Sequence, residues 1–477
     1  MTKYKNNITV VLLLLLVLMG CRSPKRTIGA NEANVPHEFS TTDTEIPLDT
    51  SSSLAELSYR EFFRDQNLIT LIDSGLSYNN NMLVAIKQIE IAEEAVKQVK
   101  WGHVPIVDLA VGAASINRPS DNSMNGRMAS QFMGRSYMED YSTRLSMSWE
   151  ADIWGKIKNR KAAALATYLE SKEAVNAVRT SLIAGIAKGY YDLLLFDQQK
   201  EISTRNLAII DSTLEITKVQ QQLGLTTSLA VRQVEISRVN LLKSIRVIEE
   251  NITVQEYALN ALVGRMPDHI KYRGQLGKIE ARASFATGVP ATLLSRRPDI
   301  KQAEFRFLRS VSEVNIARAN MYPSLRITAE GGLNSFKASN WFNIPGSLFG
   351  IVAGSLTQPL LDGRRLKTEY NQAGIRTDQA EIQFKESVLQ AVSEVSTILE
   401  QLASLREQQI FNDDLVAKNL ELIEQAKILF KNDMATYLEI LLAQQTKLQA
   451  ELDQMLVKSE LLYAEVALYR ALGGGIQ

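Results

Sequence analysis

The sequence repeats itself, and this internal duplication restricts the possible folds more than any other feature. A shift of 218 positions places Pro105 on Pro323, and a shift of 208 positions places Gly155 on Gly363. The shift becomes smaller because the first copy contains a longer polar insert, around residues 119–140. Repetition over such a length predicts one structural unit built twice.

We divide the chain accordingly into five segments. They are a leader at 1–20, a tether at 21–53, a first repeat at 54–267, a linker at 268–289 and a second repeat at 290–477. Each repeat is predicted to contain two strands followed by a helical hairpin. The strands are expected at about 104–115, 140–150, 322–335 and 347–358, and the hairpins at about 155–264 and 363–472.

Proline placement and heptad spacing predict long helices. None of the 11 prolines falls within 120–266 or 360–477, and an interior proline costs a helix about 3 kcal/mol. Val388, Val392 and Val395 follow the spacing of a coiled coil. A helix of roughly 65 residues would be near 100 Å long at about 1.5 Å per residue. An ordinary amphipathic helix can show the same spacing of apolar residues along one face, but such a helix is much shorter.

Each long helical run is interrupted once, at the equivalent point of the two copies. Gly224 can adopt a positive φ and end the first helix, and Thr227 can cap the next one. In the second copy Thr436 is the corresponding cap. Each copy is therefore predicted to form a coiled-coil hairpin with its turn at the tip.

Four segments change to the period-two alternation of β-strands. Leu325, Ile327 and Ala329 alternate with polar residues, and 107–112 and 141–149 behave alike. A weaker fourth apolar set is Phe349, Ile351 and Ala353. About ten residues is the length of a tilted membrane strand with an apolar outside and a polar lumen. A soluble hairpin with one face on a core would show the same alternation.

Aromatic residues near the strand ends fit the interfacial girdles of a membrane barrel; they are Tyr141, Trp149, Tyr322 and Trp341. Four strands cannot close a barrel, because about eight is the minimum. Open sheet edges in lipid would also leave backbone groups without hydrogen bonds. If these strands cross a membrane, several copies of the chain must share one barrel.

The N-terminus has the pattern of a secretory signal peptide. Lys3 and Lys5 precede the apolar run Val10–Met19, which is too short to span a bilayer comfortably. The four residues ending at Cys21 resemble a bacterial lipobox, in which that cysteine is lipidated and becomes the mature N-terminus. An uncleaved anchor with a buried cysteine is the alternative. Arg22 is not the Asp that commonly retains lipoproteins at the inner membrane, so the resemblance favours the outer membrane.

Composition excludes several other classes of protein. Lys and Arg number 53, as do Asp and Glu, so no net field attracts nucleic acid. One cysteine and 3 scattered histidines provide no recognisable metal cluster. No catalytic triad order, phosphate-binding glycine loop or paired-carboxylate site is recognisable, so we expect no enzyme.

Four motifs in order resemble the outer membrane factor family, the TolC-like channel-tunnels, and in particular its lipoprotein efflux branch. They are Leu293–Ile300, Ala317–Leu325, Gln358–Arg364 and Ala435–Ile440. The resemblance covers essentially the whole mature chain. It implies an α+β membrane protein that forms a homotrimeric channel-tunnel. Three protomers would contribute four strands each to a 12-stranded outer-membrane β-barrel, above a long periplasmic α-helical barrel with an equatorial domain around its middle.

The same resemblance implies a passive exit duct for drugs or other small molecules. An inner-membrane pump, often of the resistance-nodulation-division type, and a periplasmic adaptor would deliver the substrate. A duct for type I protein secretion or for metal ions is the alternative within transport, and a periplasmic coiled-coil adaptor is the alternative outside it. The only attached group expected is the lipid on Cys21.

Charged residues on the predicted strands are candidates for the barrel lumen. They are Asp108, Arg144, Arg326 and Glu330. Their mixed signs suggest a hydrated lumen without strong charge selection, and ion pairing among them is an equal alternative. We expect them to tune conductance and not the choice of substrate.

Residues at the hairpin tips are candidates for a periplasmic gate. Glu439 occupies a position where the family carries an acidic constriction residue, and three such carboxylates brought together would favour cations and have raised pKa values. One turn later Leu442 is apolar, and the residue of the first copy aligned with Glu439 is Ala230. The gate would then be an apolar constriction formed by Leu442 and Leu229, with Glu439 as a single charged ring. The alternative is that Glu439 is a solvated residue near the start of a helix and has no role in the gate.

Overall fold

The computed structural model describes residues 36, 39, 48–49, 53–282, 285–432 and 434–476. The predicted signal peptide, Cys21 and most of the tether lie outside these residues. The chain divides into two compact units. Among the described residues, the first unit comprises Ile91–Tyr168 and Phe305–Ile382, and the second comprises the remainder.

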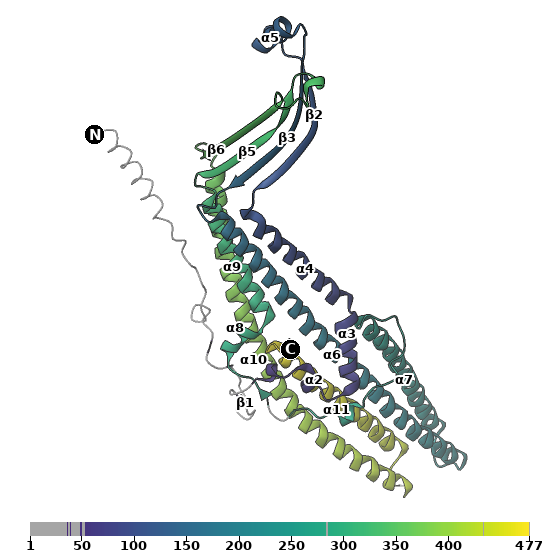
Figure 1. The fold of residues 1–477 in the computed structure, drawn as a ribbon. Coiled ribbons are helices and arrows are strands. Elements are labelled where there is room, and N and C mark those ends of the chain that lie inside the picture. Colours follow the sequence, from purple (N-terminus) through teal and green to yellow (C-terminus); the bar gives the residue numbers. More distant parts are fainter. Residues whose placement is uncertain are drawn as a thin grey trace. The chain divides into compact units, whose positions relative to one another are not determined.

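A four-stranded antiparallel sheet organises the first unit, with its strands side by side in Figure 1. Its order is β2-β3-β5-β6, so β2 and β6 are the edge strands. The strands are β2 (Ile106–Asn117), β3 (Met138–Glu150), β5 (Ser324–Ser335) and β6 (Leu348–Thr357). The helix α5 (Met124–Met133) lies in the connection between β2 and β3. It occupies the insert that distinguishes the first copy from the second.

The register of the sheet corrects the expected apolar face of β6. Ile351 lies opposite Glu330, and Val352 lies opposite Ala329. Residues directly opposite each other share a face, so Phe349, Ile351 and Ala353 lie on the polar face. The apolar face of β6 is formed instead by Leu348, Val352 and Leu356. Both alternating sets of this strand are apolar, so its sequence did not identify which set faces which side.

A β-bulge shifts the alternation of β2. The register shifts between Ala110 and Ala113, and Gly112 has a φ of 76° within this bulge. Only glycine adopts this φ without steric cost. Leu109 lies opposite Leu145 before the bulge, whereas Ala114 lies opposite Tyr141 after it. Odd-numbered residues therefore face the apolar side before the bulge, and even-numbered residues face it afterwards.

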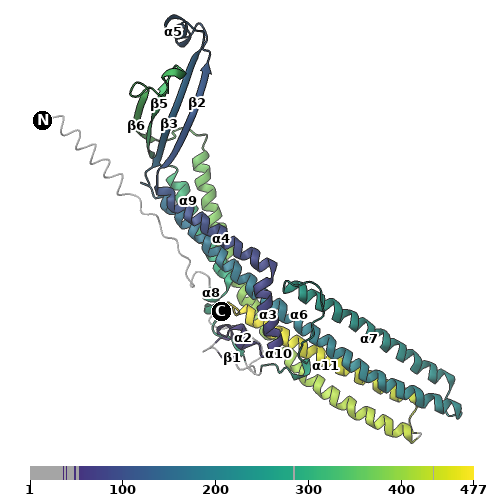
Figure 2. The ribbon, with the colours of Figure 1, turned by 45° about the vertical axis from the view of Figure 1, so that its right-hand side comes forward.

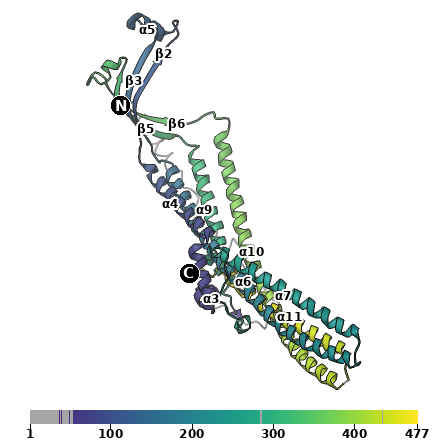
Figure 3. The ribbon, with the colours of Figure 1, turned by 90° about the vertical axis from the view of Figure 1, so that its right-hand side faces the viewer.

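Two long helical hairpins supply most of the second unit, and two of their helices extend into the first. They are α6 (Lys156–Gln222) with α7 (Ser228–Leu262), and α10 (Arg365–Lys431) with α11 (Tyr437–Ala471). Each pair joins a helix of 67 residues to one of 35 residues. The two hairpins lie side by side, with their turns at the same end (Figures 2 and 3).

The long helices begin in the same way in both hairpins. Gly155 precedes α6 with a φ of 71°, and Gly363 precedes α10 with a φ of 64°. The carboxylate of Asp152 then accepts a hydrogen bond from the backbone N–H of Ile157 at 2.8 Å. Asp362 accepts one from Leu366 at 2.9 Å. A carboxylate on the free amides of a first turn stabilises a helix start.

Shorter elements complete the described chain. The helices are α2 (Tyr59–Phe62), α3 (Gln66–Tyr78), α4 (Asn80–Lys100), α8 (Leu293–Arg296) and α9 (Pro298–Ala319). The single 3₁₀ turns are η1 (Leu54–Glu56), η2 (Trp101–His103), η3 (Leu276–Lys278), η4 (Pro290–Thr292) and η5 (Ala338–Asn340). In the linker, β4 (Phe285–Ala286) pairs in parallel with β1 (Leu48–Asp49). Among the described residues, no helix combines the length and hydropathy needed to cross a membrane.

A buried guanidinium joins three helices of the second unit. Arg297, 9% exposed, makes two hydrogen bonds to Asp299, at 2.6 and 3.0 Å. It also donates to Glu394 on α10 at 2.7 Å and to the carbonyl of Ala471 on α11 at 2.9 Å. Burial would raise the pKa of Asp299, but hydrogen bonds and charge from Arg297 outweigh burial and lower it. This arginine lies in the Leu293–Ile300 motif, which the sequence identified without a role.

Replacing Arg297 with Gln should lower the free energy of unfolding by about 3 kcal/mol, because it removes the charged hydrogen bonds by which a buried guanidinium joins α9, α10 and α11. Urea unfolding of the purified protein in detergent, followed by circular dichroism, measures the change. The matched control is Arg296→Gln, whose ion pair with Glu56 is half-exposed and should contribute no more than about 1 kcal/mol.

The effect of Arg297 should depend on pH. The lowered pKa of Asp299 stabilises the fold above the ordinary carboxyl pKa of about 3.9, and this contribution disappears as the pH falls through the folded-state value. The difference in stability between wild type and variant should therefore narrow as the pH falls below about 4. Equal losses of stability for the two arginine variants at neutral pH would contradict the assigned role.

Candidate functional site

The two hairpin turns are built alike, but their caps differ. In the first turn Gly224 has a φ of 75°, and the Thr227 side chain accepts a hydrogen bond from the backbone N–H of Ala230 at 3.4 Å. In the second turn Thr436 and Glu439 form a capping box at the start of α11. The second cap is stronger because its carboxylate satisfies an additional backbone donor.

Glu439 is exposed and hydrogen-bonded within its own turn. Its carboxylate accepts the backbone N–H of Thr436 at 2.8 Å and also the hydroxyl of that residue. The hydroxyl hydrogen bond, together with backbone hydrogen bonds, lowers the pKa of Glu439. Glu439 is thus an ionised helix-capping residue in the single chain, and the raised pKa expected for three copies stays a prediction.

The other three predicted gate residues differ in exposure. Leu229 is 68% exposed and Leu442 is 52% exposed, so both present apolar side chains to the surface of this chain. Ala230 is 0% exposed. Its methyl group packs inside the hairpin, whereas the carboxylate of Glu439 lies on the surface.

Tyr437 connects the two hairpin tips. It packs against a cluster on α6 and α7 that includes Leu214 and Val234, and against a cluster on α10 and α11 that includes Phe430 and Ile440. Its hydroxyl donates to the side-chain oxygen of Gln233 on α7 at 3.1 Å. Tyr437 therefore makes both an apolar and a polar contact between the described tips.

Polar side chains also tie α6 to α11 farther from the tips. The buried amide of Gln444 donates to the hydroxyl of Thr213 at 2.8 Å, and Asn206 donates to Glu451 at 3.1 Å. The hydroxyl of Tyr463 donates to Asp192 at 2.5 Å. Our sequence reasoning missed these ties; polar residues at the apolar positions of a heptad pattern would have been the signal.

The sheet places all four predicted lumen residues on one face. Asp108 lies opposite Ser146, which lies opposite Glu330. Arg144 and Arg326 belong to the same alternating sets of β3 and β5. Among these residues, Arg144 and Glu330 form an ion pair at 3.4 Å. The structure therefore shows a polar face with one cross-strand pair, and a role for it in a lumen stays a proposal.

The opposite face of the sheet is apolar and exposed in the single chain. Leu109 is 67% exposed, Leu145 is 51% exposed and Val352 is 80% exposed. Exposed apolar surface of this extent marks a contact with lipid or with another protein.

Aromatic side chains lie near both ends of the sheet. The rings of Tyr141 and Trp341 are 5.6 Å apart near one end, and those of Trp154 and Tyr322 stack at 4.7 Å near the other. On β3, Tyr141 and Trp149 are eight residues apart, which corresponds to roughly 26 Å at about 3.3 Å per residue. For a strand tilted by about 40°, this length corresponds to a height of roughly 20 Å, close to the apolar band of about 25 Å between aromatic girdles. Within the described part of the chain, no group of three metal-ligating side chains is present.

The family model described as "Outer membrane efflux protein" matches residues 71–265 and again residues 289–474. The chain belongs to the outer membrane efflux protein family. It is the outer-membrane component of an efflux pump in a bacterium, and the family is not enzymatic. The predicted family and function class are confirmed.

Individual relatives match along most of their length. The "Probable efflux pump outer membrane protein SepC" of Pseudomonas putida strain F1 is 28% identical over 426 residues, 88% of this chain and 86% of the relative. The "Probable outer membrane lipoprotein SilC" of Salmonella typhimurium is 24% identical over 464 residues, 96% of each chain. Among solved structures, the outer-membrane channel OprN superposes with a TM-score of 0.83 at 21% identity, over 96% of this chain and 98% of its own. This last similarity shows the fold alone.

Proposed function

We propose that the protein is the passive exit duct of a tripartite efflux system and exports drugs or other small molecules. The observation that carries this proposal is the two-faced sheet, polar with an ion pair on one side and apolar and exposed on the other. A periplasmic adaptor and an inner-membrane pump, of the resistance-nodulation-division type, would supply the substrate. The efflux names of relatives such as SepC support this assignment.

We also propose that three chains share one 12-stranded barrel. Each chain provides four strands and two edges, at β2 and β6. Pairing β2 of one copy with β6 of the next would satisfy both edges, as a membrane requires. The two family matches and the equal 67- and 35-residue helices support an internal duplication, with repeats at 54–267 and 290–477 joined by 268–289.

A lipid on Cys21 would add a second attachment to the outer membrane. The apolar leader and the lipobox-like sequence support cleavage after residue 20. SilC, a relative of similar length, is described as a lipoprotein. Acyl chains anchor durably only together with a second membrane contact, which the barrel would provide.

Deleting the gene should increase susceptibility to several members of a panel of antibiotics, dyes and detergents, because their exit route would be lost. Minimum inhibitory concentrations of the deletion strain and of a complemented strain measure the effect. Outer-membrane fractions of the complemented strain should contain a heat-resistant trimer in detergent. Unchanged susceptibility to every compound, or a protein that is only monomeric, would refute the exit duct.

Replacing Glu439 with Ala should raise basal conductance or weaken block by divalent cations, because it removes the charged ring proposed at the tip. Single-channel recording in planar bilayers measures both quantities. Thr436→Ala is the matched control, because it weakens the same helix cap but keeps the carboxylate. If both variants change the recording equally, capping explains the effect; an unchanged recording for Glu439→Ala removes this residue from the gate.

Replacing Arg144 with Ala should change single-channel conductance measurably while leaving the drug profile of the cell as it was. The cross-strand pair with Glu330 lies on the polar face, where it would set local charge along a wide, hydrated lumen. Conductance and the susceptibility panel are measured on the same variant. A large change in which drugs are exported would contradict this role.

A further inference from the structure

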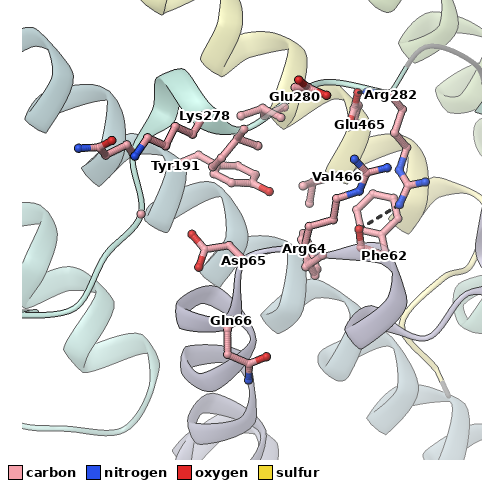
Figure 4. A pocket seen from close by; sticks show the side chains of 15 residues that line it. Phe62, Arg64, Asp65, Gln66, Tyr191, Lys278, Glu280, Arg282, Glu465 and Val466 are labelled. Carbon is pink, nitrogen blue, oxygen red and sulfur yellow. Dashed lines mark hydrogen bonds between the residues drawn. The ribbon is translucent and has the colours of Figure 1, made fainter.

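A pocket in the second unit has no role in the exit duct as proposed. It has a volume of about 400 Å³ and lies among the α2–α3 connection, the linker segment 274–282, α6 and α11 (Figure 4). This volume lies within the range of small-molecule sites, about 300–1,000 Å³. The pocket is made neither by the hairpin tips nor by the sheet.

One wall of the pocket is apolar and rigidly held. The rings of Phe62 and Phe63 meet edge to face at 4.9 Å, and Leu462 and Val466 of α11 continue this wall. The guanidinium of Arg282 lies 4.8 Å from the centre of the Phe62 ring and donates to the Phe62 carbonyl at 3.0 Å. This wall can hold the hydrocarbon part of a ligand.

Two of the acidic side chains that line the pocket already have hydrogen-bond partners. Asp65 accepts from the backbone N–H of Asn67 at 2.8 Å and from the hydroxyl of Tyr190 at 2.7 Å. Glu465 accepts from the backbone N–H of Arg282 at 2.6 Å. Burial raises the pKa of Glu465 despite this hydrogen bond and the nearby arginines. Because the raised pKa favours the neutral acid, Glu465 attracts a cation less strongly.

Glu280, the third acidic residue of the lining, interacts through its charge with Lys458 outside the pocket, and the remaining charged or phenolic groups are donors. Tyr191 is only 6% exposed, no described residue hydrogen-bonds to its hydroxyl, and the hydroxyl points into the pocket (Figure 4). Burial, and secondarily the charge of Glu465, raises the pKa of Tyr191, so its hydroxyl keeps its proton. Arg64 and Lys278 also line the pocket, and neither forms an ion pair with a described residue within 4.0 Å.

The Tyr191 hydroxyl opens onto the pocket and can donate a hydrogen bond there, and the positive charges of Arg64 and Lys278 in the same lining favour an anion. We propose that this pocket binds a small amphipathic carboxylate. Its hydrocarbon part lies against Phe62 and Val466, and its carboxylate accepts a hydrogen bond from the Tyr191 hydroxyl in a lining that also contains Arg64 and Lys278. Hydrogen bonds to ionised acceptors are the strong ones, and they favour a carboxylate over an amide of the same shape.

Phenylacetate is the probe for this site, and phenylacetamide is its neutral counterpart. Calorimetric titration of the purified full-length protein in detergent should show saturable binding of phenylacetate, about tenfold weaker for phenylacetamide. Tyr191→Phe should weaken phenylacetate binding by about tenfold, and Arg64→Gln should weaken it severalfold. Lys87→Gln, an exposed cation that does not line the pocket, is the matched control and should bind like the wild type.

Three results would overturn the proposal. They are equal affinity for the acid and the amide, unchanged binding by both Tyr191→Phe and Arg64→Gln, and absence of saturation at about 10 mM phenylacetate. Tyr191→Phe keeps the aromatic ring, and circular dichroism verifies its fold. If this variant fails to fold, the Arg64→Gln titration decides alone, since that side chain is exposed.

Discussion

The unpaired backbone N–H and C=O groups at the two edges of the sheet are the main constraint on how this protein can lie in a membrane. Within the described residues, the edge strands β2 and β6 each have one side that no other strand pairs. In hydrocarbon every such backbone group costs several kcal/mol, and the adjoining apolar face is exposed. No single copy of the chain can satisfy both the face and the edges. In the shared barrel that we propose, copies that join edge to edge would satisfy these groups.

Much of the helical architecture could be predicted, because its signals are local. Proline-free runs, Gly224 and the two capping threonines identify the hairpins to within a few residues of the observed helices. The apolar face of β6 could not be predicted, because Phe349 and Ile351 alternate with residues that are just as apolar. The bulge at Gly112 also reverses the alternation of β2, and the apolar and polar residues around it do not predict this reversal.

Some parts of the candidate sites could also be predicted from the sequence, and others could not. The lumen candidates share a face because they follow simple alternation along paired strands, and the spacing of Thr436 and Glu439 is itself the signature of a capping box. The environments of Arg297 and Tyr191 could not be predicted. Each depends on segments that are distant in sequence, and without coordinates nothing indicates that these segments meet.

The unequal caps of the two hairpin turns have a consequence for symmetry. Helices of matched length would give a trimer six nearly equivalent hairpins, and thus a quasi-sixfold ring. Ala230 and Glu439 occupy equivalent positions in the duplicated sequence, yet one is a buried methyl and the other an exposed carboxylate. Negative charge would then alternate around that ring, so a partner that docks at the tips would meet two chemically different kinds of surface.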